Sequence, residues 1–193
     1  MSRRMGQNKA LMPFLGQPLI TRIFDRLKPA ADEVILTTNS PEDFEFLGVK
    51  MVLDDLPGTG ALGGLYTALK AASHPLVAVA ACDMPFASAD LLRAQMEILL
   101  REEYDAAVPC WKDQLEPMHA VYRRDACLPQ LLRALDAGER KVTSVVANLN
   151  LYCITYDELL AADPYGLAFS NVNTPVEFKQ AENLAKALES KSA

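Results

Sequence analysis

The stretch "PLVAVAACD" (residues 75–83) decides the fold. It is almost continuously apolar, which is typical of a strand that helices cover on both faces of a parallel sheet. The run ends at Asp83, and a proline soon after it stops the strand. Ligands of open α/β sheets bind outside the carboxyl ends of the strands. The sequence therefore predicts a buried strand that brings a carboxylate to a ligand crevice.

Strand and helix patterns alternate on both sides of this run. Other expected strands cover residues 33–39, 49–55, 104–111, 116–122 and 151–158. Helical patterns cover residues 18–29, 61–73, 88–103, 124–138 and 174–190. The last opens with a capping box, in which Thr174 is the N-cap and Glu177 follows three residues later. This order predicts an α/β fold with a mostly parallel sheet, and the absence of a linker pattern predicts a single domain over residues 1–193.

Composition limits the classes of function. Half of the residues are hydrophobic and the net charge is −6, which suits a globular protein and argues against binding of nucleic acid. The sequence has neither a membrane-length apolar run nor the apolar core of a signal peptide, so we expect a cytoplasmic protein without membrane contact. The four cysteines lack metal-ligand or redox spacing, and we expect them to be buried, reduced thiols.

A basic cluster lies in "SRRMGQNKALMPFLGQPLI" (residues 2–20). Arg3, Arg4 and Lys9 flank Gly6, and a glycine lets the backbone approach a ligand closely. Arginine guanidinium groups match phosphate oxygens with paired hydrogen bonds. The cluster predicts a cradle for a small anionic ligand, although a solvated basic terminus fits the same residues.

Three further groups could carry chemistry. Asp83 suits Mg²⁺, which takes few carboxylates together with substrate phosphates, but a turn aspartate is the alternative. In "LDDLPGTGALGGL" (53–65), Asp54 could accept hydrogen bonds from a base or ribose, while the alternative is a plain loop before a helix. Asn171 and Asn173 alternate in an extended segment and so share one side. They could hold a phosphate or a metal-bound water, or form an ordinary turn.

Together these stretches resemble the molybdenum cofactor guanylyltransferase family, nucleotidyltransferases with a three-layer Rossmann-like fold and a mostly parallel mixed sheet. The resemblance runs from residue 2 to about residue 185 and also rests on "CDMPF" and "NVNTPVEF". The family's opening motif begins with an apolar strand and a Leu-Ala-Gly-Gly loop, which are missing here. We therefore expect a natural protein that starts further upstream and a sheet with one more central strand.

The resemblance implies that the terminal phosphate of molybdopterin attacks the α-phosphorus of GTP and that pyrophosphate leaves. The catalytic residues would be Arg4 and Lys9, which neutralise the triphosphate, and Asp83, which holds Mg²⁺. The implied GTP site comprises Arg3, Arg4, Lys9, Asp54, Gly63 and Asp83. Asn171 and Asn173 would bind molybdopterin. Proteins that deliver or receive the cofactor would make transient contacts.

Two other functions fit the same pattern. One is a cytidylyl- or other nucleotidyltransferase that acts on a pterin or a sugar phosphate, because the loop at 56–64 does not distinguish guanine from cytosine. The other is a non-catalytic nucleotide-binding relative, since half of the phosphate-binding motif is absent.

Overall fold

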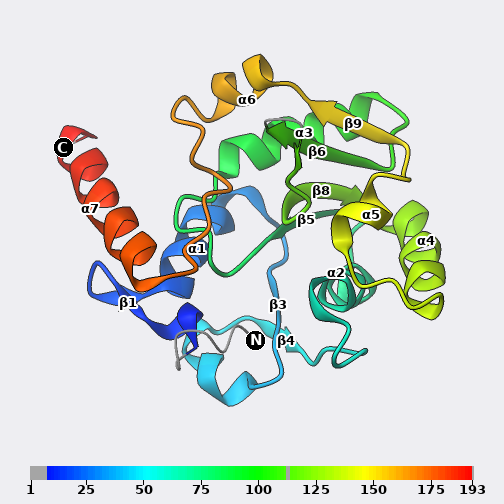
Figure 1. Cartoon of the computed structure of the whole chain (residues 1–193), viewed down its shortest axis with the longest axis horizontal. Helices are drawn as coiled ribbons and strands as arrows, with labels where there is room; N and C mark the ends of the chain where they lie inside the picture. The colour runs from blue at the N-terminus through cyan, green and yellow to red at the C-terminus, as the bar shows by residue number, and fades with distance from the viewer. Residues whose placement is uncertain (1–7, 112–113, 193) are drawn as a thin grey trace.

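The structure is a computed structural model that describes residues 8–111 and 114–192. Figure 1 shows strands at the centre with helices around them. Helix α3 (Ala89–Arg101) packs on one face of the main sheet, where Leu92 and Leu99 meet Ala107 and Val121. Helices α2 (Gly60–Ala71) and α4 (Arg124–Asp136) pack on the other face. The result is an α/β fold, as the alternating pattern predicts, with the three-layer arrangement that the family resemblance implies.

Within residues 8–111 and 114–192 the main sheet has five strands and is mixed. They are β5 (Leu76–Ala80), β6 (Ala106–Trp111), β7 (Gln114–Leu115), β8 (His119–Arg123) and β9 (Leu151–Ile154). Strand β8 lies between β5 and β6 and is antiparallel to both, whereas β9 is parallel to β6. The mixed α/β sheet is confirmed. The sequence does not predict that β8 runs antiparallel to its neighbours, because the hydrophobic pattern indicates burial and not the direction of a strand.

A separate pair of parallel strands lies beside α2. Strands β3 (Ile35–Thr37) and β4 (Lys50–Val52) pair with each other, and α2 contacts both this pair and β5. Within the described ranges, β5 pairs only with β8 and β3 only with β4. The expected additional central strand stays a prediction.

A short hairpin precedes α1 (Leu19–Leu27). It joins β1 (Pro13–Phe14) to β2 (Gln17–Pro18). Both turn residues, Leu15 (φ 53°) and Gly16 (φ 85°), have left-handed backbones, as hairpin turns of two residues favour. The left-handed conformation is sterically unfavourable for Leu15, whereas it is not for glycine. The N–H of Leu15 donates a hydrogen bond to Glu182 of α7 (Pro175–Ser192) at 3.2 Å. The hairpin is thereby tied to the last helix.

The remaining elements are short. They are α5 (Val142–Val146), α6 (Tyr156–Ala162) and the 3₁₀ helices η2 (Lys9–Leu11), η3 (Lys28–Ala30) and η4 (Pro41–Leu47). Several expected boundaries are wrong, and for two of them the structure shows the local cause. The strand expected at 151–158 ends at Ile154, because Thr155 and Glu158 form a capping box that starts α6. The strand expected from residue 116 begins at His119, after a turn in which the N–H of His119 donates to the carbonyl of Glu116.

The expectation of four buried, reduced cysteines is wrong. Cys110 of β6 and Cys153 of β9 form a disulfide. Of the free thiols, Cys127 is buried and Cys82 is exposed. A cysteine pairing set by neighbouring strands is not readable from spacing along the chain. In the described residues, no helix has both the length and the apolar character needed to cross a membrane.

Candidate active site

Asp83 lies just beyond the carboxyl end of β5, as the sequence predicts. The strand's pairing with β8 continues through a bond from the N–H of Ala81 to the carbonyl of Met118 at 2.9 Å. After Asp83, the side chains of Met84, Phe86 and Ala87 are buried in the core that α1 and α7 share. The chain that carries Asp83 is therefore anchored on both sides, while 22% of the Asp83 side chain is exposed.

Two arginines of α1 hold the loop that follows Asp83. The Nε of Arg22 donates to the carbonyl of Pro85, and the Nε of Arg26 donates to that of Ala87, each at 2.9 Å. A third contact comes from β8, where the buried Nε2 of His119 accepts a hydrogen bond from the N–H of Ser88 at 3.0 Å. Burial lowers the pKa of His119 to about 4, so the imidazole is neutral and able to accept this bond near pH 7.

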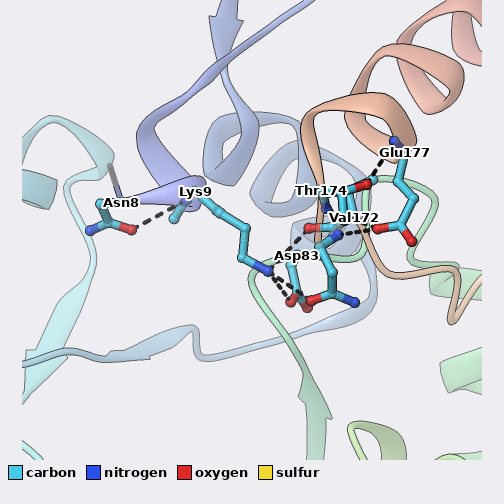
Figure 2. A network of polar contacts seen from close by, with 8 residues as sticks. Asn8, Lys9, Asp83, Val172, Thr174 and Glu177 are labelled. Carbon is cyan, nitrogen blue, oxygen red and sulfur yellow. Dashed lines mark hydrogen bonds and ion pairs between the residues drawn. The ribbon is translucent and has the colours of Figure 1, made fainter. Parts of the chain in front are cut away.

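Lys9 joins three segments at this loop. Figure 2 shows its ammonium group pointing at Asp83 and at the chain ahead of α7. The Nζ atom lies 3.1 Å from the Asp83 carboxylate, 3.1 Å from the carbonyl of Val172 and 2.9 Å from Oδ1 of Asn173. Only 9% of the Lys9 side chain is exposed. An ammonium group has three donors, so these acceptors satisfy all of its hydrogen-bonding capacity.

The backbone closes this network into a ring. The N–H of Val172 donates to the carbonyl of Asp83 at 3.0 Å, while the carbonyl of Val172 accepts from Lys9. The Val172 side chain is buried. Val172 is held by its buried side chain and by these two hydrogen bonds, so its carbonyl is a fixed part of the wall of the site.

The predicted capping box begins α7 and is confirmed. Oγ1 of Thr174 accepts the N–H of Glu177 at 3.2 Å. Oε2 of Glu177 accepts the N–H groups of Asn173 at 2.7 Å and Thr174 at 2.9 Å. The N–H group of Asn173 is the largest cause that lowers the pKa of Glu177, and the charge of Lys9 also contributes.

Asp54 lies in a different, local arrangement. Its Oδ1 accepts the N–H of Leu56 at 3.0 Å and the hydroxyl of Thr67 at 3.3 Å. Its own N–H donates to Oδ1 of Asn39, which follows β3, at 3.1 Å. The carboxyl ends of β3 and β4 are thus linked, but among the described residues no hydrogen bond or ion pair joins Asp54 to Lys9 or Asp83.

Gly63 lies inside α2, where it is buried. A Cβ atom there would overlap Oγ1 of Thr59 and lie 3.2 Å from the carbonyl of Leu56. The Thr59 hydroxyl itself donates to that carbonyl at 2.5 Å. Close packing against Thr59 and Leu56 therefore explains why this position is glycine. The predicted contact of Gly63 with GTP stays a prediction.

The structure brings together three of the residues predicted from the sequence, namely Lys9, Asp83 and Asn173. Asn171 and Asn173 are both exposed on either side of the buried Val172, in keeping with their alternation. Arg3 and Arg4 lie outside the described residues.

Sequence reasoning missed the Val172 carbonyl and Asn8. Oδ1 of Asn8 accepts the N–H of Ala10 at 3.3 Å and caps η2, which holds Lys9. The preference of asparagine for helix N-caps was the available clue for Asn8, whereas a backbone carbonyl leaves no trace in the sequence.

Comparison with known proteins identifies the family. A sequence model of the MobA-like NTP transferase domain matches residues 1–151. The chain belongs to the MobA-like NTP transferase family. A protein from Pelotomaculum thermopropionicum named "Probable molybdenum cofactor guanylyltransferase" is 36% identical over 185 residues, which cover 96% of this chain and 89% of that protein. The "Molybdenum cofactor guanylyltransferase" of Desulfosudis oleivorans is 32% identical and covers 96% and 92%, respectively.

Solved structures agree with this MobA-like assignment. The molybdopterin-guanine dinucleotide biosynthesis protein A of Archaeoglobus fulgidus superposes with a TM-score of 0.84 at 26% identity, covering 97% of this chain and 95% of that one. The 2-C-methyl-D-erythritol 4-phosphate cytidylyltransferase of Thermus thermophilus, at 19% identity, shares the fold with a TM-score of 0.66. The family, the Rossmann-like fold and the nucleotidyltransferase class predicted from the sequence are confirmed.

Proposed function

We propose that this chain transfers GMP from GTP to the molybdopterin form of the molybdenum cofactor and releases pyrophosphate. The observation that carries the proposal is the convergence of Lys9, Asp83 and Asn173 at the carboxyl end of β5 in a MobA-like transferase. The names of relatives that match nearly the whole chain support guanine as the transferred base.

In this reaction a terminal phosphate oxygen of molybdopterin forms a bond to the α-phosphorus of GTP. The bond between that phosphorus and the oxygen leading to the β-phosphate breaks, and the electron pair leaves with pyrophosphate. Transfer of this kind depends on positioning and charge neutralisation, so it needs no nucleophilic side chain. Lys9 supplies a positive charge, together with Arg3 and Arg4 in the proposed GTP site, which also includes Asp54 and Gly63. Asn171 and Asn173 face molybdopterin.

Lys9 has to exchange partners when substrate binds. Its ammonium group already donates to three oxygens, so a phosphate oxygen can be bound only if at least one of these contacts opens or is shared. The carbonyl of Val172 is fixed by packing. Asp83 and Asn173 are side-chain acceptors and are the partners that can move.

The residues present fit magnesium that arrives with the nucleotide. No group of three or more His, Cys, Asp or Glu side chains in the described ranges could form a closed metal site, and Asp83 is a lone carboxylate. Mg²⁺ is commonly held by one or two carboxylates plus substrate phosphates, which suits a single aspartate at the nucleotide site. When bound, the ion would neutralise charge on the phosphates, with Asp83 as its protein ligand.

The test is a transfer assay with purified protein, molybdopterin and magnesium, in parallel with GTP, CTP and ATP. We expect formation of the guanine dinucleotide and pyrophosphate with GTP, and at least tenfold less product with the other nucleotides. Preference for CTP would contradict the guanine assignment. Selective nucleotide binding without any transfer would instead indicate the non-catalytic relative.

The proposal includes a cytoplasmic location, which the use of GTP as substrate supports. It also includes transient contact with proteins that deliver molybdopterin or receive the finished cofactor.

A further inference from the structure

Glu177 makes one hydrogen bond more than its helix requires. In a capping box the side chain of the third helical residue accepts the N–H of the N-cap residue, which here is Thr174. The same Glu177 oxygen also accepts the N–H of Asn173, one residue ahead of the cap, and this is the shorter of the two bonds at 2.7 Å. The extra bond serves Asn173 and not the helix.

Asn173 is held by polar contacts alone. Its neighbour Val172 is buried and fixed, but Asn173, Thr174 and Pro175 are all exposed. Packing therefore does not determine the backbone at Asn173. The backbone at Asn173 is instead held by the hydrogen bond from its N–H to Glu177. This bond sets the direction from which the Asn173 side-chain amide reaches Lys9 at 2.9 Å.

The charges along this path are arranged consistently. Figure 2 shows Glu177 beside Thr174 at the start of α7 and the ammonium group of Lys9 at Asp83. Asn173 links the two, because its N–H donates to Glu177 and its Oδ1 accepts from Lys9. The ammonium group contributes to the low pKa of Glu177, although no hydrogen bond joins the two. An ionised carboxylate and the ammonium group thus attract each other across the Asn173 main chain.

We propose that Glu177 is a positioning residue for the Lys9–Asp83 pair. It fixes Asn173, and Asn173 keeps the Lys9 ammonium group on the Asp83 carboxylate. As Lys9 exchanges partners on substrate binding, Glu177 determines where the released Asn173 amide stands, on the molybdopterin side of the site. The role in turnover rests on the proposed function, whereas the geometric role does not.

The chain supplies a matched control. Helix α6 begins with the same motif, in which Oε2 of Glu158 accepts the N–H of Thr155 at 2.8 Å and Oγ1 of Thr155 caps the helix. Figure 1 shows α6 and α7 as separate helices. Within the described residues the carboxylate of Glu158 accepts hydrogen bonds from Tyr152 and Thr155, and none from Lys9. Glu158→Ala therefore removes equivalent capping chemistry, together with the bond that Glu158 accepts from the Tyr152 hydroxyl, without touching the site.

The experiment compares Glu177→Ala, Glu177→Gln and Glu158→Ala with the wild-type chain. Each is assayed for GMP transfer to molybdopterin and for thermal stability. We expect Glu177→Ala to lower kcat about tenfold. A displacement of about 1 Å can cost about 100-fold, and Glu177 acts on Lys9 only through Asn173. Glu177→Gln keeps an acceptor oxygen and should recover at least half of the activity. Glu158→Ala should lower Tm by a similar amount but leave kcat within twofold of wild type.

A second readout does not need activity. The ammonium resonance of Lys9 in ¹⁵N NMR at low temperature should be protected from exchange in the wild-type chain and in Glu158→Ala, and exchange at least tenfold faster in Glu177→Ala. If wild type transfers no GMP but this pattern holds, the proposed function fails and the positioning role stands. Equal Lys9 exchange in both alanine variants, or equal loss of kcat in both, would overturn the proposal.

Discussion

Two polar clusters lie at the carboxyl ends of strands in this molecule, and they are built in opposite ways. Lys9 bonds to residues 74, 163 and 164 positions away in the chain. Asp54 bonds to residues 2, 13 and 15 positions away. The first cluster exists only when three distant segments have packed. The second joins neighbouring segments of the chain, namely the ends of β3 and β4 and the helix α2 that follows them. The cluster at Lys9 and Asp83 therefore depends on tertiary packing, whereas the cluster at Asp54 depends on contacts between residues that are near in the sequence.

The clusters also differ in their exposure to water. The Lys9 and Asp83 side chains are 9% and 22% exposed. Beside Asp54, the Lys70–Asp55 pair is 57% and 41% exposed. Exposed ion pairs contribute little, while removing one partner of a buried pair leaves a charge without compensation. Substitutions at the first cluster should consequently have the larger effects.

The largest effect is expected from Lys9→Met. The variant keeps the length of the side chain but removes the charge, so if Lys9 binds the phosphates as proposed, the transition state loses a donor there. We expect transfer activity to fall about 100- to 1,000-fold, which is the usual consequence of removing one such donor. Lys70→Met is the control and should retain at least half of the activity. Equal activity of the two variants would remove the distinction between the clusters.

The next effect concerns pH and His119 beneath the Asp83 loop. Its native pKa is about 4, while an unfolded histidine has a pKa of about 6.5, so the unfolded chain takes up the proton first as pH falls. This contribution to stability is complete above about pH 6.5 and is lost towards pH 4, amounting to about 3 kcal/mol. Urea unfolding across this range should show a shallower pH slope for His119→Gln, and parallel curves would contradict the assignment.

A smaller effect is expected in the loop cluster from Gly63→Ala. The new methyl group would overlap Oγ1 of Thr59 and approach the Leu56 carbonyl. Such overpacking should lower the free energy of unfolding by about 2 kcal/mol. Gly64→Ala is the matched control, because a Cβ there meets no atom within 4 Å and alanine stabilises a helix interior by about 0.5–1 kcal/mol. If both variants are equally stable, the close approach is not what requires glycine at position 63.

The smallest change in stability is expected from Asp54→Asn. Asparagine keeps the oxygen that accepts from Leu56 and Thr67, so the free energy of unfolding should change by less than about 0.5 kcal/mol. If Asp54 contacts GTP as proposed, KM for GTP should rise about tenfold, because one charge-assisted hydrogen bond is lost. An unchanged KM would mean that Asp54 stabilises the turn and does not contact GTP.

The sequence predicted much of this site because some of its determinants are local. The continuous apolar run of β5 placed Asp83 at the end of a strand, and the Thr174–Glu177 spacing placed the start of α7. Both follow from hydrophobic pattern and capping chemistry within a few residues.

What the sequence could not predict depends on distant packing or on the backbone. No residue near Lys9 in the sequence indicates that its ammonium group pairs with Asp83 or donates a hydrogen bond to the carbonyl of Val172. The Cys110–Cys153 disulfide likewise follows from the pairing of β6 with β9, and the antiparallel direction of β8 from the topology of the sheet. Residue types and their spacing carry no direct record of these arrangements.

The central claim is that Asp83, held by Lys9, is the centre of nucleotidyl transfer. Its most direct test is GMP transfer from Mg–GTP to molybdopterin by Asp83→Asn, measured across a magnesium titration with folding verified by circular dichroism. The account predicts at least a 100-fold loss of activity that saturating magnesium does not restore, because a neutral amide would not hold the ion in position at the phosphates even when the ion is bound. Activity within threefold of wild type in a folded variant would contradict it.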